Sequence, residues 1–162
     1  MKTFISLSAT FLSLTLNAQT YEAPLFLNDS SGESGQYVLG TGIQSFDDLN
    51  VASGTFSLAL GSAAYATGNY STVIGTQSVS SGLGSVAIGG GVDSEGLYSV
   101  GLGSGTLASG DYSTAMGQNT IASGDYSTAM GYYTTANGSR STAIGSGTTP
   151  NGAASVAMGS NT

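Results

Sequence analysis

The chain of 162 residues contains no cysteine, no histidine and no tryptophan, and only two prolines. Without cysteine or histidine there can be no zinc finger, no thiol nucleophile and no imidazole base. Charged residues make up 7% of the chain, against about 25% in an ordinary soluble domain. The few acids fall at expected surface turns, with no apolar pocket implied around them. We therefore expect no enzyme, no metal site and no cofactor.

Positive charge is equally scarce. Lys2 and Arg140 are the only basic residues, against nine acids, and the formal net charge is -7. Such a chain has no patch that could neutralise phosphates, so we expect no nucleic acid partner. An anionic membrane surface would repel it.

Residues 1–18 have the features of an export signal: Lys2, a short apolar run, and the small residue Ala18 before the expected cleavage point. The alternative is an N-terminal strand or helix of the fold. The segment is too short and too rich in hydroxyl groups for a membrane span, and glycine and hydroxyl residues interrupt every later apolar run. We expect a secreted, extracellular protein that does not insert into the membrane through this chain.

What the sequence does have is a strict 14-residue period. Eight units, the last of them incomplete, fill residues 54–162, and each begins with glycine. The fourth position is always serine, and the eighth is always glycine, at Gly61, Gly75, Gly89, Gly103, Gly117, Gly131, Gly145 and Gly159. The seventh is always large and apolar, at Leu60, Ile74, Ile88, Leu102, Met116, Met130, Ile144 and Met158. Fixed self-similarity of this kind predicts a solenoid.

Each unit reads as one flattened coil. A segment such as Ser113–Gly117 is typical of a short strand, a second short strand follows, and the two glycines supply the corners. Stacked coils pair their backbones at about 4.8 Å. We therefore predict an all-β fold, a parallel β-roll or β-solenoid in which each repeat unit forms one coil. Residues 40–53 read as a degraded first coil, with Phe46 at the large apolar position, and residues 19–39 as an N-terminal linker or cap.

Side chains alternate along a strand, so the third, fifth and seventh positions share one face and the fourth and sixth share the other. We expect the large residues of the seventh position to form the repeat core inside the roll. The small residues would then meet another subunit, and Ala129→Leu should disrupt the oligomer. That candidate contact face comprises Ser113, Ala115, Ser127, Ala129, Ser141 and Ala143.

Segments 85–89, 141–145 and 155–159, with sequences SVAIG, STAIG and SVAMG, resemble the YadA-like head repeat of trimeric autotransporter adhesins. The resemblance covers residues 54–162. It implies a left-handed β-roll, a homotrimer, and display outside the cell, where the head binds an extracellular matrix protein such as collagen, or a glycan. It also implies that segment 85–89 and its equivalents take part in collagen binding. Attachment to a cell surface would come from a further C-terminal part or from a partner.

Three columns admit two interpretations. The aromatic residues of the third position could pack coil on coil or form an exposed ligand stripe; they are Phe56, Tyr70, Tyr98, Tyr112 and Tyr126. Asp111 and Asp125 could form a solvated ladder or part of a calcium site, although calcium needs six to eight oxygens. The threonines of the fifth position suit an ice-binding array if exposed, whereas the Val and Leu residues among them favour an interior face; they are Thr72, Thr114, Thr128 and Thr142.

These features predict an extracellular adhesin-like head that binds matrix or other surfaces through many repeated weak contacts. The competing function is a self-assembling structural rod, filament or fibre component, and an ice-binding protein ranks below it. Sedimentation separates the first two, because a head should form a discrete trimer and a filament should grow with concentration.

Overall fold

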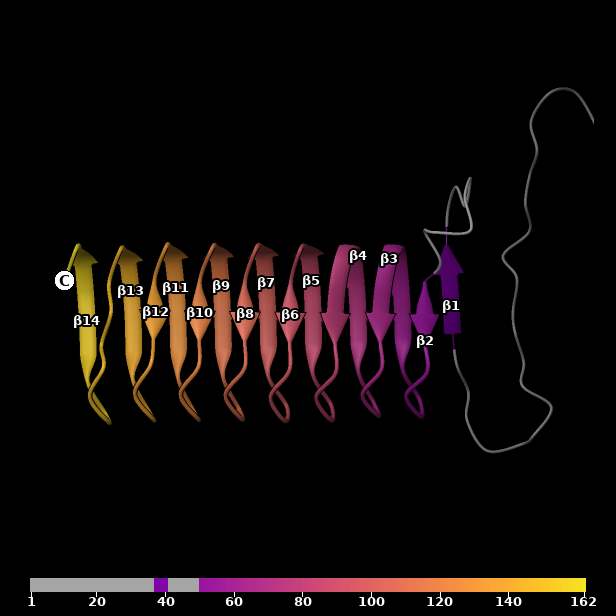
Figure 1. The fold of residues 1–162 in the computed structure, drawn as a ribbon, viewed down its shortest axis with the longest axis horizontal. Coiled ribbons are helices and arrows are strands. Elements are labelled where there is room, and N and C mark those ends of the chain that lie inside the picture. The colour runs from indigo at the N-terminus through magenta and orange to yellow at the C-terminus, as the bar shows by residue number, and fades with distance from the viewer. Residues whose placement is uncertain (1–36, 41–49) are drawn as a thin grey trace, which may run out of the picture.

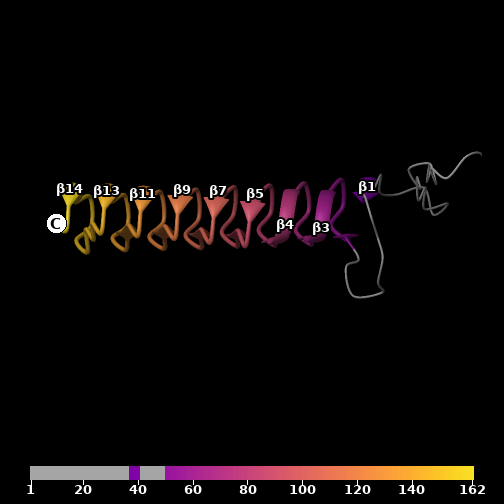
Figure 2. The same ribbon diagram turned by 90° about the horizontal axis from the view of Figure 1, so that it is seen from above.

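The computed structural model describes residues 37–40 and 50–162, and all regular secondary structure in this part of the chain is β-strand. The strands form a row of stacked coils that ends at the C-terminus (Figure 1). Seen from above, successive coils are nearly identical loops (Figure 2). Within these residues no helix has the length and hydrophobicity that a membrane span requires.

One side of the solenoid is a row of longer strands, which hold the fifth to ninth positions of each unit. Two of them continue through both sides of their coil, namely β3 (Leu58–Ala66) and β4 (Thr72–Ser80). The others in this row are β5 (Val86–Gly90), β7 (Val100–Ser104), β9 (Thr114–Gln118), β11 (Thr128–Tyr132), β13 (Thr142–Ser146) and β14 (Val156–Ser160).

The other side is a row of two-residue strands at the twelfth and thirteenth positions. This short row contains β2 (Val51–Ala52), β6 (Asp93–Ser94), β8 (Leu107–Ala108), β10 (Ile121–Ala122) and β12 (Thr135–Ala136). The arrows of the two rows point in opposite directions, while each strand pairs in parallel with its neighbours in the same row (Figure 1).

The coils stack in register. Thr128 lies opposite Thr142 and Met130 opposite Ile144 in the long row, and Ile121 lies opposite Thr135 in the short row. The two members of each pair are separated by one full period, so every position of the unit forms a column along the solenoid. The predicted fold, a parallel β-solenoid with one repeat unit per coil, is confirmed.

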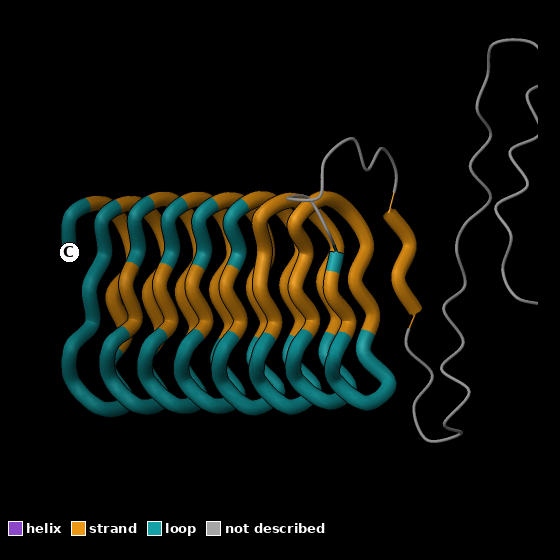
Figure 3. The backbone as a smooth tube through the Cα atoms, turned by 45° about the vertical axis from the view of Figure 1, so that its right-hand side comes forward, coloured by secondary structure: helices purple, strands orange, loops and turns teal. Residues whose placement is uncertain are grey.

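The corners depend on left-handed backbone and on the absence of side chains. The loops gather along one edge of the solenoid (Figure 3), where Ser127 N–H donates to the Gly124 carbonyl at 3.1 Å and Tyr126 adopts a φ of 57°. At the other corner, the eight glycines of the eighth position have φ between 122° and 149°. A Cβ on Gly131 would overlap the carbonyl oxygen of Gly145 in the next coil, so this column admits no side chain.

The interior of the solenoid contains small residues. The fourth, sixth, eleventh and thirteenth positions point inward, and Ser113, Ala115, Thr120 and Ala122 are all fully buried. The expectation that the seventh position fills the interior is wrong, because these residues point outward. Those on the outer face, half-buried or exposed, are Leu60, Ile74, Ile88, Leu102, Met116, Met130, Ile144 and Met158.

The two rows of strands lie too close together for large side chains. Val92 reaches across the interior, and a Cβ added at Gly101 would lie 2.6 Å from its Cγ1 atom. Alanine, serine and threonine therefore fill the space, and the bulky aliphatic residues of the same strands have to face outward. The alternation of faces was predicted correctly, but the inner face was assigned the wrong way round.

The N-terminal side departs from the predicted register. β2 pairs with β3 at the expected spacing of one period, with Val51 opposite Tyr65. However, β1 (Tyr37–Gly40) also pairs with β3, and Leu39 lies opposite Leu60 at a spacing longer than one period. The predicted register would have placed Phe46 there. Phe46, the signal segment 1–18 and most of the linker 19–39 lie outside the described residues.

Candidate binding surfaces

The most extensive candidate surface is the outer face of the long row, which we call the apolar stripe. It consists of the fifth and seventh positions of every coil and contains Leu, Ile, Val, Met and Thr side chains. Ile74, Ile88 and Ile144 are 40%, 37% and 36% exposed. A continuous row of aliphatic residues that are half-buried or exposed is typical of a surface that packs against another protein.

The small residues that were expected at a subunit contact cannot make one. All six lie inside the coil with 1% or less of their surface exposed, namely Ser113, Ala115, Ser127, Ala129, Ser141 and Ala143. The prediction of a contact face at these residues is wrong, because the fourth and sixth positions are buried inside each coil. A partner subunit would instead contact the large residues of the same strands, on their opposite face.

The aromatic column forms a stacked and exposed ladder. The ring centroids of Tyr98 and Tyr112 are 5.6 Å apart, and those of Tyr112 and Tyr126 are 5.0 Å apart with planes 4° from parallel. Phe56 and Tyr70 stack in the same way at 5.5 Å. Tyr112 has both faces covered by its neighbours, and each of the other rings has one face covered. This geometry fits coil-on-coil packing better than sugar stacking.

Asp111 and Asp125 are part of a ladder of hydrogen bonds. Leu97 N–H donates to Asp111 Oδ1 at 2.9 Å, and Asp111 N–H donates to Asp125 Oδ1 at 3.1 Å. Asn69 accepts from Thr55 N–H in the same position of an earlier coil. These carboxylates therefore bind backbone of the preceding coil. Among the described residues no group of three or more acidic side chains is arranged to hold a metal ion.

The threonines of the fifth position face outward, contrary to the interior expectation. Thr114, Thr128 and Thr142 lie half-buried within the apolar stripe. The same column contains Leu58, Val86 and Val100, so the hydroxyl groups do not form a continuous array. This arrangement fits a mixed protein-contact face better than an ice-binding face.

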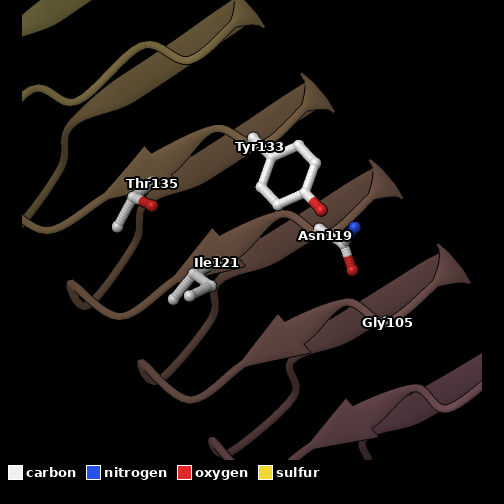
Figure 4. Close-up of a pocket in the computed structure, with 5 residues that line it drawn as sticks. All are labelled: Gly105, Asn119, Ile121, Tyr133 and Thr135. Carbon is white, nitrogen blue, oxygen red and sulfur yellow. The ribbon is translucent and has the colours of Figure 1, made fainter.

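A shallow hollow of about 280 Å³ lies on the side of the short row (Figure 4). Its lining residues come from three successive coils and are Gly105, Asn119, Ile121, Tyr133 and Thr135. We did not predict this site from the sequence. Its signal was there, because Tyr132 and Tyr133 occupy the ninth and tenth positions, where the other units have no aromatic residue.

The repeats match a known protein family. The model of the YadA head domain repeat (2 copies) matches residues 52–78, 66–91, 94–120 and 122–148. A comparison with curated proteins finds no match. The family match covers more than half of the chain and lies within the coils that carry the apolar stripe and the glycine corners. The chain therefore belongs to the YadA head repeat family, whose heads are adhesive and structural modules of trimeric autotransporter adhesins.

Proposed function

We propose that this chain is an extracellular adhesin head that assembles as a homotrimer through its apolar stripe and binds host matrix or other surfaces. The observation that carries the proposal is the outward position of the aliphatic residues in every coil. Membership of the YadA head family supports it, since proteins of this family are trimeric in general and extracellular or surface-exposed.

The stripe supports assembly because its residues lie outside the coil and take no part in packing its interior. The stacked backbones and small inner side chains complete each coil without them. Burying exposed aliphatic surface contributes about 25 cal/mol for each Å² removed from water. Repetition along the whole solenoid makes this contribution large, and a three-fold arrangement of parallel chains would bury all three stripes around one axis.

Export follows from the proposed signal segment at residues 1–18, which would be removed from the mature head. Adhesion would then use the surfaces left outside the trimer, namely the short row and the loop edge. Many weak contacts repeated along the coils and across three subunits would give high avidity without any single deep pocket.

The stripe predicts that a charge at its centre blocks assembly. Met116→Lys would place three ammonium groups against one another near the proposed axis, where burial of unpaired charge is costly. We expect the mature wild-type chain to sediment as a trimer and the variant as a folded monomer. Analytical ultracentrifugation together with far-UV circular dichroism measures both properties.

Leu107→Lys is the matched control, since Leu107 is also half-buried and outward-facing but lies on the short row. It should remain a trimer. A trimer that persists in Met116→Lys, or is lost equally in both variants, would show that the stripe is not the interface. Growth into long particles with rising concentration would instead favour the structural rod or filament.

Adhesion itself is tested on immobilised collagen, fibronectin and laminin. The trimer should bind at least one of these at a concentration well below that needed by the Met116→Lys monomer. A monomer has one copy of each binding surface instead of three, so it loses the avidity of the trimer. If neither form binds any of the three matrix proteins, the proposal of matrix adhesion is wrong even where the trimer is found.

A further inference from the structure

The hollow on the short row is a built site on the side of the solenoid away from the apolar stripe. Asn119 and Tyr133 come from the tenth position of successive coils, and Ile121 and Thr135 from the twelfth, on β10 and β12. Gly105 leaves one end of the hollow open, and the Asn119 side chain leans over it, since a Cβ on Gly105 would lie 2.5 Å from Asn119 Oδ1. The ring of Tyr133 lies beside Asn119 (Figure 4).

Tyr133 is a poor choice for folding at this corner. Its φ is 50°, in the left-handed region that bulky residues rarely adopt. The equivalent position holds glycine in three other coils and smaller non-aromatic residues at φ of 50–54° in the rest, so Tyr133 is the one aromatic residue at this corner of the described coils; the others are Gly91, Gly105, Gly147, Ala63, Gln77, Asn119 and Asn161.

The tyrosines of the ladder stack on the equivalent ring of a neighbouring coil, whereas the ring of Tyr133 contacts its chain neighbour Tyr132 edge to face, with centroids 4.5 Å apart. Tyr133 as a whole residue is 55% exposed. An exposed aromatic ring held in an unfavourable conformation, outside the repeat pattern, points to a role in binding.

The lining selects an uncharged ligand with both an apolar face and hydroxyl groups. It combines an aromatic ring, a side-chain amide, a hydroxyl and an aliphatic side chain, and none of its five residues is charged. Among the described residues the charged side chains are Asp93, Glu95, Asp111, Asp125 and Arg140, an acidic balance that disfavours anionic ligands.

A sugar ring has this chemistry: its C–H groups form an apolar face that packs on an aromatic ring, and its hydroxyls bond to amides and hydroxyls around the edge. The volume lies just below the range of roughly 300–1,000 Å³ typical of small-molecule sites, which suits one ring of an oligosaccharide.

We propose that the hollow binds a neutral saccharide, with Tyr133 packing on one face of the sugar ring and Asn119 and Thr135 bonding its hydroxyls. This assignment deepens the proposed adhesin function and rests on it for display outside the cell. Because the hollow lies on the short row, it stays open when the apolar stripe is covered, and a trimer would present three copies of it.

The test uses the full mature chain on an array of neutral oligosaccharides ending in galactose, glucose, mannose, fucose, N-acetylglucosamine or N-acetylgalactosamine, with sialylated glycans as anionic comparators. Saturation-transfer NMR with the matching free monosaccharide then checks each positive. We expect binding to at least one neutral glycan, and at least a tenfold weakening in Tyr133→Gly.

The control is Tyr98→Gly, the same change at another left-handed corner, where Gly84 shows that glycine is accepted one coil earlier. It should leave glycan binding unchanged. If Tyr133→Gly fails to fold, Tyr133→Asn replaces it, since Asn119 and Asn161 occupy the same position at φ of 52° and 54°.

Three results would overturn the assignment: no neutral glycan bound by the wild-type chain at millimolar monosaccharide, binding restricted to sialylated glycans, or equal loss in the Tyr133 and Tyr98 variants. Binding of the wild-type trimer to matrix proteins alongside an empty glycan array would overturn the saccharide site alone. Absence of the trimer and of matrix binding would overturn the proposed function, whatever the array shows.

Discussion

At two points of each coil the backbone of the next coil comes so close that a single methyl group does not fit. A Cβ on Gly124 would overlap the carbonyl oxygen of Gly138, and one on Gly131 would overlap that of Gly145. Gly131 has in addition a φ of 126°, which side chains rarely adopt. These glycines therefore set the distance between coils.

Gly131→Ala should consequently be among the most damaging conservative changes in the chain. We expect a loss of about 3 kcal/mol or more in the free energy of unfolding, because both the φ and the overlap oppose the methyl group. Urea denaturation followed by circular dichroism measures the loss.

Gly91→Ala is the control for this prediction. Its φ is 62° and its nearest neighbours would lie 3.9 Å from an added Cβ, and Ala63 already occupies this position in another coil at a φ of 50°. We expect a cost of about 1 kcal/mol. Equal costs for the two variants would contradict the close approach of the coils.

A second effect at the scale of single residues concerns hydroxyl groups inside the coil. Thr120 is fully buried, and its Oγ1 atom has no hydrogen-bond partner. In an Ala129→Gly background, which gives a valine the same room that Gly101 gives Val92, Thr120→Val removes the unpaired hydroxyl and should raise the stability by about 1 kcal/mol. Thr120→Ser in that background, which keeps the hydroxyl and removes a methyl, should be less stable in the same thermal denaturation; a Val variant no more stable than its background would contradict the argument.

At the scale of the strand, side chains of adjacent coils compensate one another's size. Val92 occupies a position that holds threonine in all five following coils, and the inner position of the next strand, β7, is Gly101 in place of the usual alanine. Because a Cβ on Gly101 would lie 2.6 Å from Val92 Cγ1, the glycine makes room for the valine.

Gly101→Ala should therefore destabilise the solenoid, and Val92→Thr in the same chain should restore much of the loss by returning both positions to the common pair. We expect a coupling energy of about 1 kcal/mol between the two changes. A double-mutant cycle in urea measures it, and strictly additive effects would show that the two sites are independent.

The strands also show what could and could not be predicted from the sequence. The period fixed the register and the glycine corners, because every coil contributes the same evidence. The alternation of Ser113, Thr114 and Ala115 separated two faces but did not identify the inner one. That choice depends on the distance between the two rows of strands, which alternation does not contain, and large residues are a poor guide to the interior of so thin a coil.

The site was predicted less well than the fold for a related reason. Aromatic residues that repeat, such as Tyr112 and Tyr126, attract attention as a column, yet their repetition serves packing. Tyr133 breaks the pattern and lines the hollow together with Asn119. In this chain the proposed saccharide site therefore lies at a departure from the repeat.

At the scale of the whole molecule, the solenoid is a stack of equivalent coils in which each contacts its two neighbours. The stability of such a stack is close to a sum over coils and the interfaces between them. The stripe, the aromatic ladder and the short row run along different sides of the same stack, so assembly and ligand binding can change independently.

Deletion of residues 110–123 removes one complete coil and joins Ser109 to Gly124 in register. We expect a folded solenoid with a lower denaturation midpoint, because one coil and one interface are lost. Deletion of residues 110–116 removes half a coil, places corner residues opposite strand residues, and should prevent folding from that point onward. Circular dichroism distinguishes the two, and equal behaviour of both deletions would contradict the stacked-coil architecture.

The alanine, serine and threonine interior has a thermodynamic consequence. Opening a single coil exposes little hydrocarbon to water, so the unfolding of one chain should have a small heat capacity change and a stability that varies little with temperature. The hydrocarbon lies mainly outside, on the stripe. In this protein the usual calorimetric signature of a hydrophobic core would therefore belong to the association of chains, and its size would depend on protein concentration.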